Sequence, residues 1–189
     1  MRIRIYTLNE HLNFAPHVND GIMSLANCMP GLRAGVRVGE WVAGITPARM
    51  GLRLAFLMRV NIVYTRVQYW RRFRDTRLDS IYVPQFDEAG AFMHFYAQRQ
   101  NPWHGADRYA YDTESERIPL SGCYFNFTPG YDAWERTPQG LALPPQYEAL
   151  LGKGVRGAGA FRDVPLSFLP WVTTQPTVKL QTLDEFVLP

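Results

Sequence analysis

The chain has 189 residues, of which 47% are hydrophobic and 20% charged, and this composition excludes a disordered chain and suits one folded domain over residues 1–189. The N-terminus shows no signal-peptide pattern, and no apolar run is long enough to span a bilayer, so we expect a cytoplasmic protein that does not engage a membrane. The only two cysteines, Cys28 and Cys123, form no CxxC pair, which favours a reducing compartment.

The net charge of +3 hides an asymmetry along the chain. Residues 1–80 carry twelve basic and five acidic side chains, and the remainder carries eight basic and twelve acidic ones. Nearly all of the basic residues are Arg, whose planar fork binds phosphate and stacks on bases, so a nucleic-acid or nucleotide partner is one interpretation. An equally good interpretation is that these Arg side chains only face solvent.

The N-terminal half alternates strand and turn patterns. The first predicted elements are a strand over 2–8, a loop over 9–20, a short strand or helical turn over 21–28 and a brief helical or turn segment over 31–35. They are followed by a strand over 36–45 with a tight turn at Gly39-Glu40, one long central strand over 52–64 with a bend near Arg59, and a helix over 65–73 with Thr65 as its N-cap.

The C-terminal half adds fewer regular elements. We predict strands over 81–83 and 91–96, a long loop over 98–116, a strand over 119–128, a helix beginning at Pro144-Pro145 and ending at Gly152, and coil beyond, with one short helix near 182–187. The sum is an α+β domain with a mixed or antiparallel, curved, barrel-like sheet and a few short helices. Residues 131–189 are a Pro/Gly-rich elaboration of the core.

Common catalytic signatures are absent from the sequence, which contains no GxGxxG, GKS or GKT, GxSxG or HExxH motif. The four histidines do not have metal-ligand spacing, so we expect no metal site. Asp20, Glu40 and Cys28 are the candidate catalytic groups, although each is as readily a structural residue. No cofactor is indicated by the sequence.

What remains is aromatic and Arg chemistry of the kind that holds a planar base. Ring stacking contributes ~1–3 kcal/mol for any base, so discrimination requires polar groups at the base edge. Asn19, Asp20, Ser24 and Asn126 are candidates for that task. For any single aromatic side chain, a place in the core is the alternative.

One dense stretch carries a family resemblance. Phe14-Ala15-Pro16, Gly21, the run from Ser24 to Pro30, Leu32-Arg33 and the run from Val38 to Gly44 resemble the opening of the second type of nucleotide-modification-associated domains. The likeness continues through Tyr69-Trp70, the run from Asp79 to Tyr82, and Leu120 to Phe125, and so covers residues 1 to about 130. The chain departs from the family pattern at His17, at Ile22-Met23 and at Glu40.

The resemblance implies a role in DNA base hypermodification systems of phages and bacteria, with partner enzymes of such a system. The Gly39-Glu40-Trp41 step also resembles PUA-like barrels such as the EVE and YTH modules, which grip modified bases.

The leading hypothesis is therefore recognition of a modified or flipped nucleobase by a PUA-like domain, with Arg33 at a phosphate or base edge. The alternatives are an enzyme acting on the base or its sugar and an interaction subunit without a ligand. The predicted ligand-binding residues are Phe14, Pro16, His17, Asn19, Asp20, Ser24, Asn27, Arg33, Trp41, Tyr69, Trp70, Tyr124 and Asn126.

Overall fold

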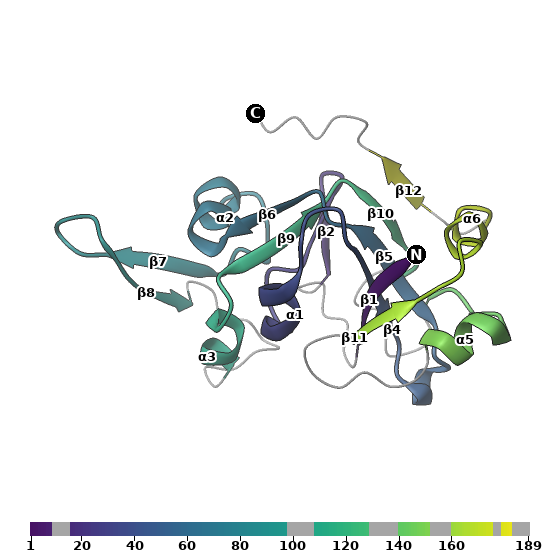
Figure 1. The fold of residues 1–189 in the computed structure, drawn as a ribbon. Helices are drawn as coiled ribbons and strands as arrows, with labels where there is room; N and C mark the ends of the chain where they lie inside the picture. The colour runs from purple at the N-terminus through teal and green to yellow at the C-terminus, as the bar shows by residue number, and fades with distance from the viewer. Residues whose placement is uncertain (9–15, 98–107, 129–139, 152–159, 176–178, 183–189) are drawn as a thin grey trace.

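The described strands form three separate sheets (Figure 1). The structure is a computed structural model, and it describes residues 1–8, 16–97, 108–128, 140–151, 160–175 and 179–182. One sheet has six strands, the second has four, and a two-stranded hairpin projects from the body.

The six-stranded sheet has the order β11-β1-β4-β5-β10-β12. Its strands are β1 (Arg2–Thr7), β4 (Trp41–Ile45), β5 (Leu54–Arg59), β10 (Cys123–Asn126), β11 (Ala160–Asp163) and β12 (Lys179–Thr182). β1 and β4 are parallel and every other pair is antiparallel. Both edge strands come from the C-terminal region, so that region completes this sheet.

The four-stranded antiparallel sheet has the order β2-β3-β9-β6. Its strands are β2 (His17–Asn19), β3 (Ile22–Ser24), β6 (Ile62–Thr65) and β9 (Arg117–Ser121).

The chain crosses between the two sheets twice at one corner, from β5 to β6 and from β9 to β10. The Asn61 backbone N–H donates to the Leu120 carbonyl at 2.9 Å, and the Gly122 N–H donates to Asn61 Oδ1 at 2.8 Å. The two crossings therefore fasten each other.

The third sheet is the hairpin arm, formed by β7 (Tyr82–Phe86) and β8 (Phe92–Ala97), which extends away from the body in Figure 1. Short helices lie between the strands along the chain. They are α1 (Pro30–Gly35), the 3₁₀ helix η1 (Ala48–Met50), α2 (Arg66–Phe73), α3 (Arg108–Thr113), α5 (Pro145–Leu151) and α6 (Phe168–Thr173).

Helix α2 begins with a full capping box. The Gln68 backbone N–H donates to Thr65 Oγ1 at 3.2 Å, and the Thr65 N–H donates to Gln68 Oε1 at 2.8 Å. These bonds satisfy two backbone donors at the start of the helix, and the predicted N-cap at Thr65 is confirmed.

The six-stranded sheet is packed on both faces because strand residues alternate between them. Trp41 and Phe125 belong to the cluster on one face, which α5 and α6 cover. Val42 and Tyr124 belong to the cluster on the other face, which includes Leu32 of α1.

The structure confirms the mixed α+β class and corrects several predicted elements. The predicted strands over 52–64 and 119–128 are each two strands, because the chain turns between sheets at Asn61 and Gly122. The predicted loop over 9–20 contains β2, the loop over 98–116 contains α3, and the predicted C-terminal coil contains β11, α6 and β12. The helix predicted near 182–187 lies outside the described residues except for Thr182, which ends β12.

The barrel-like, PUA-like arrangement is not confirmed, since the sheets formed by the described strands are open. None of the helices in the described part of the chain has the length and apolar character needed to span a bilayer.

Candidate functional site

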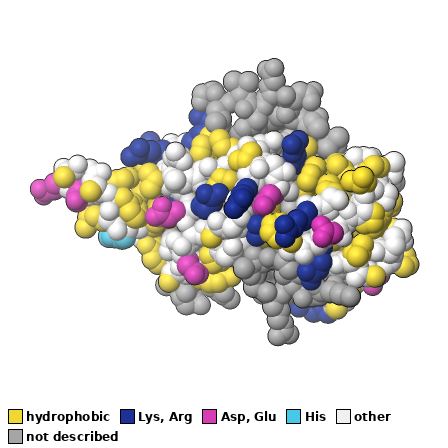
Figure 2. Space-filling view, in the orientation of Figure 1, with side chains coloured by type: hydrophobic (Ala, Val, Ile, Leu, Met, Phe, Trp, Pro, Cys, Tyr) yellow, Lys and Arg dark blue, Asp and Glu magenta, His cyan; other side chains and the backbone are white. Residues whose placement is uncertain are grey.

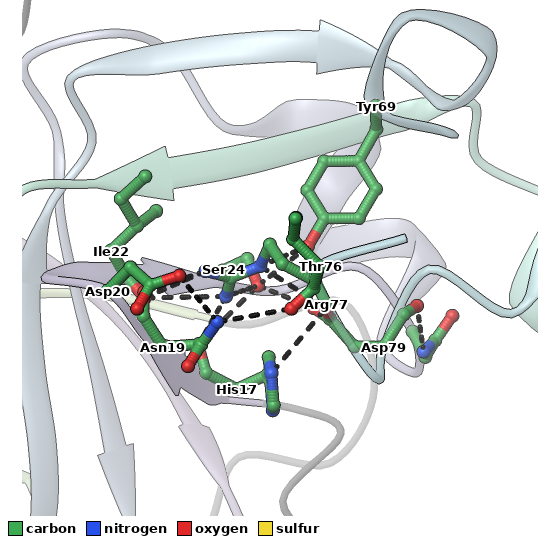
Figure 3. Close-up of polar contacts among 10 residues, drawn as sticks. His17, Asn19, Asp20, Ile22, Ser24, Tyr69, Thr76, Arg77 and Asp79 are labelled. Carbon is green, nitrogen blue, oxygen red and sulfur yellow. Dashed lines mark hydrogen bonds and ion pairs between the residues drawn. The ribbon is translucent and has the colours of Figure 1, made fainter. Parts of the chain in front are cut away.

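A buried carboxylate, Asp79, lies at the centre of a polar cluster beside the four-stranded sheet (Figure 3). Ser24 Oγ donates to its Oδ2 at 2.5 Å, and the Tyr69 hydroxyl donates to its Oδ1 at 2.7 Å. The Arg77 guanidinium forms an ion pair with Oδ1 at 3.4 Å. Charge-assisted bonds of this kind are among the strongest in proteins, so the carboxylate is fixed in position.

The Arg77 guanidinium fastens the β2–β3 hairpin from inside the protein. Its Nη1 donates to the Asn19 carbonyl at 3.0 Å, and its Nη2 donates to the His17 carbonyl at 3.0 Å and to Ser24 Oγ at 2.8 Å. Both amino groups also lie 3.3 Å from the Ile22 carbonyl. An Arg side chain that is 2% exposed therefore joins both strands of the hairpin to Asp79.

The turn of this hairpin brings polar groups to the surface. Asp20 and Gly21 both have positive φ, at 48° and 74°, as the mirror-image two-residue hairpin turn requires. Asn19 Nδ2 donates to Asp20 Oδ2 at 2.9 Å and to the Thr76 carbonyl at 3.2 Å. The carboxamide and the carboxylate are thus oriented before any ligand arrives.

A second buried network continues from the cluster around Asp79. Asn27 Nδ2 donates to the Asp79 carbonyl at 3.1 Å, and Asn27 Oδ1 accepts from Arg66 Nη1 at 3.5 Å. The Asp112 carboxylate accepts from the Tyr82 hydroxyl at 2.7 Å and from the Cys28 N–H at 2.8 Å. The Asp112 carbonyl accepts from Arg66 Nη2 at 2.6 Å. Arg66 and Asn27 together therefore link the backbone of Asp112 to that of Asp79.

Burial dominates the ionisation of these groups. Desolvation lowers the pKa of Arg66 to about 10 and, together with the nearby Arg66 charge, that of Arg33 to about 9, so both guanidiniums are charged at neutral pH. Burial first and the Asp79 charge second raise the pKa of Tyr69 well above its usual value. Burial and the hydrogen bond to Asp112 likewise raise the pKa of Tyr82. Both phenols are therefore hydrogen-bond donors at neutral pH.

A comparison with protein families identifies the family of this chain. A family model described as "Nucleotide modification associated domain 2" matches residues 1–128. The chain belongs to this family. Neither the comparison with curated proteins nor that with solved structures found a match. The match covers the four-stranded sheet, the hairpin arm and four strands of the six-stranded sheet, whereas α5, β11, α6 and β12 lie beyond it.

Within this nucleotide modification associated domain, six of the predicted ligand-binding residues lie in or beside the Asp79–Arg77 cluster. They are His17, Asn19, Asp20, Ser24, Asn27 and Tyr69. The side chains of Ser24, Asn27 and Tyr69 are buried, whereas Asn19 is half-buried and Asp20 is exposed. Asn19 and Asp20 are therefore the part of the cluster that a ligand can reach.

Arg33 is held differently from the prediction of a phosphate or base contact. The residue is fully buried, and its guanidinium donates to the carbonyls of Cys28 at 2.8 Å, Ser115 at 2.8 Å and Arg117 at 3.2 Å. This geometry favours a structural role in which Arg33 joins the segment before α1 to the segment after α3.

Other predicted residues of the domain lie apart from the cluster. Trp41 stacks on Phe125 with ring centroids 6.5 Å apart, on one face of the six-stranded sheet, whereas Tyr124 packs on the opposite face. These two side chains therefore do not share one pocket. Asn126 Oδ1 accepts from Thr128 Oγ1 at 2.8 Å.

The remaining predicted residues complete this account. Pro16 is buried directly before β2, and Trp70 lies on α2 with the Arg74 guanidinium 5.0 Å from its ring centroid. Phe14 lies outside the described residues.

The three candidate catalytic groups have structural contacts. Glu40 Oε2 accepts from the Arg37 N–H at 3.1 Å and pairs with the Arg4 guanidinium at 3.3 Å, which fixes the turn before β4. Asp20 occupies the hairpin turn, and Cys28 has positive φ directly before α1. The described residues contain no group of three or more His, Cys, Asp or Glu side chains placed to hold a metal ion.

The central pair, Asp79 and Arg77, was missed as site residues by the sequence analysis. Asp79 falls within the run that resembles the family, and Arg77 is one of several Arg residues after Trp70. The available signal was the Asp20-Gly21 dipeptide, which is typical of a tight hairpin and would have placed β2 beside β3.

Proposed function

We propose that this domain recognises a modified or flipped nucleobase, in DNA or as a nucleotide, within a DNA base modification or phage-defence system. The base edge contacts Asn19 and Asp20 at the turn of the β2–β3 hairpin. The family match supports the link to base modification systems. The observation that carries the proposal is the way in which Arg77 and Asp79 hold this turn from inside the protein.

The chemistry of the turn suits a base edge. A carboxylate oxygen and a carboxamide oxygen both accept hydrogen bonds from an exocyclic amino group. The Asn19 NH₂ group donates to Asp20 and to the Thr76 carbonyl, so the Asn19 oxygen is the atom that would contact the base. Asn19 is held by bonds to its side chain and to its carbonyl. Groups that are positioned in advance lose less entropy on binding, so this rigid hairpin favours recognition.

Recognition fits the structure better than catalysis does. Asp79 is enclosed by Ser24, Tyr69 and Arg77 and is 1% exposed, so a substrate would not reach its carboxylate without rearrangement. Glu40 is engaged by Arg4 in the turn before β4. These contacts do not place an acid and a base on one shared surface. An enzyme that acts on the base or its sugar is therefore the second candidate function.

The proposal is tested by calorimetric titration of the protein with deoxynucleoside monophosphates, amino-bearing and amino-lacking, unmodified and modified. We expect Asn19→Ala and Asp20→Asn to weaken binding of the preferred nucleotide about tenfold, as the loss of one base-edge contact does. Asp87→Asn is the matched control, because Asp87 is also an exposed acid in a hairpin turn, where its Oδ1 accepts from the Ala91 N–H.

Equal affinity of both variants and the wild type would contradict the proposal. Mass spectrometry of the recovered nucleotide separates the alternative, since a change in its mass after incubation would favour an enzyme.

A further inference from the structure

A basic surface lies on α2, beside the proposed reading turn. The helix contains no acidic residue, and Arg71, Arg72 and the following Arg74 are exposed. Arg74 forms an exposed ion pair at 3.2 Å with Asp75, its chain neighbour. Clustered Arg side chains on one short helix favour an anionic partner.

The basic surface continues into the hairpin arm. The Arg71 guanidinium lies 5.4 Å from the ring centroid of Phe86, whose ring is 6.2 Å from that of Phe92. Phe92 also lies 4.7 Å from the buried Phe95 and is itself 41% exposed. The half-buried Phe86 therefore connects Arg71 to the exposed ring of Phe92.

The segment that follows α2 reaches the reading turn. Thr76, three residues beyond the helix, accepts the hydrogen bond from the Asn19 side chain. Arg74, which caps the helix, covers the Trp70 ring. A path thus runs from Asn19 past the C-terminal turn of α2 to Phe92, and we name it the strand path.

We propose that the strand path binds single-stranded nucleic acid, so that the target base is read at Asn19 and Asp20 while it is part of a strand. This inference rests on the proposed function for the place of the target base. Arg71, Arg72 and Arg74 contact phosphates of the strand, and a neighbouring base stacks on Phe92.

The charges and rings fit this occupant. The three exposed Arg side chains lie within about one turn at the C-terminal end of α2, so their positive charges act together. Alternating cations and rings are typical of single-strand binding surfaces, because every base has a face that stacks. Asp87 and Glu88 give the tip of the arm a negative charge, so the path ends before the tip. In Figure 2 the acidic tip, the hydrophobic arm and the basic side chains near its root follow one another in that order.

Fluorescence anisotropy at several salt concentrations tests the inference, with a labelled 15-nucleotide oligodeoxycytidylate as the probe. Calorimetry with deoxycytidine monophosphate gives the affinity for a single nucleotide. We expect the wild type to bind the oligonucleotide more tightly than the monophosphate. The Arg71→Ala/Arg72→Ala/Arg74→Ala variant should lose about tenfold or more in oligonucleotide affinity, and its salt slope should fall by about 2, since each phosphate contact on a single strand contributes ~0.7.

Phe92→Ala should weaken oligonucleotide binding several-fold through lost stacking and leave the salt slope unchanged. Neither variant should alter the affinity for the monophosphate. Arg37→Ala/Arg49→Ala is the matched control, because it removes two exposed Arg residues outside the path. Circular dichroism establishes that each variant is folded.

An oligonucleotide affinity no greater than that for the monophosphate would overturn the inference. An equal loss of oligonucleotide affinity in the α2 variant and in the control would also overturn it. So would a Phe92→Ala variant that keeps its oligonucleotide affinity while light scattering shows that the substitution breaks a dimer. Binding of the oligonucleotide through the α2 arginines, together with unchanged binding by Asn19→Ala and Asp20→Asn, would refute the proposed base reading and support the strand path.

Discussion

Replacing Asp79 by Asn tests whether the buried cluster fixes the β2–β3 hairpin. The substitution keeps the size of the side chain and removes its charge. Ser24, Tyr69 and Arg77 all direct donors at the Asp79 carboxylate. An Asn amide offers one acceptor oxygen and brings an NH₂ group close to one of these donors. The substitution also removes the carboxylate that pairs with the Arg77 guanidinium among the described contacts.

The expected loss follows from burial. The side chains of Asp79 and Arg77 are 0% and 2% exposed. Removing one partner of a buried ion pair costs about 3–5 kcal/mol, because the other charge stays buried without compensation. The free energy of unfolding of a domain is about 5–15 kcal/mol in total, so Asp79→Asn removes a large fraction of it.

Urea unfolding followed by circular dichroism measures this loss. Asp75→Asn is the matched control, since Asp75 is 82% exposed in its ion pair with Arg74 and should change the free energy of unfolding by less than about 1 kcal/mol. If Asp79→Asn is too unstable to purify, Tyr69→Phe gives a smaller loss of about 1.5–3 kcal/mol, because it removes a hydroxyl that donates to Asp79 and accepts from Arg77 but leaves these two charges paired. An Asp79→Asn variant within about 1 kcal/mol of the wild type would refute the reasoning.

Two further predictions concern pH and packing. Because burial raises the pKa of Tyr69 in the folded state, the unfolded chain loses this proton first, near pH 10, and the free energy of unfolding falls as the pH rises above about 10. The wild type should therefore lose more free energy of unfolding than Tyr69→Phe between about pH 9 and 11. Equal losses in the two proteins would count against this cause. In Gly44→Ala the new Cβ would lie 2.3 Å from a ring carbon of the fully buried Phe56, so we expect a loss of about 1–3 kcal/mol in thermal unfolding. Gly90→Ala has open space around its Cβ, so its cost of about 1–2 kcal/mol comes from its positive φ alone, and a Gly44→Ala variant as stable as the wild type would argue against close packing at Gly44.

Local patterns predicted those parts of the fold that depend on near neighbours. The helix after Thr65 follows from its capping box, and the strand at Arg2–Thr7 follows from its alternation. The two strand breaks at Asn61 and Gly122 were not predictable in the same way, because both halves of each run are apolar and only contacts between distant segments direct them into different sheets. The strands after residue 159 lack a clear alternating pattern and form because they pair with β1 and β10.

The candidate site was predicted in its residue types more than in its arrangement. His17, Ser24, Asn27 and Tyr69 were expected near a ligand, and they surround a carboxylate that the sequence analysis left out. Asp79 and Arg77 are separated from the hairpin by more than fifty residues, so their contacts depend on tertiary structure. Trp41 was expected to bind a base, and the structure places its ring on Phe125, packed against the core cluster of the six-stranded sheet.

The central claim is that a base edge contacts the turn of the β2–β3 hairpin, and nuclear magnetic resonance tests it most directly. Isotope-labelled protein is titrated with the nucleotide that calorimetry identifies as the tightest ligand, and the shifts of assigned amide signals are followed. The account predicts the largest shifts at the Asn19 side-chain amide and at the backbone amides of Asp20, Gly21 and Thr76, with the Asp87 turn unchanged. Shifts that leave the β2–β3 turn unaffected and fall around Trp41 on the six-stranded sheet would contradict it.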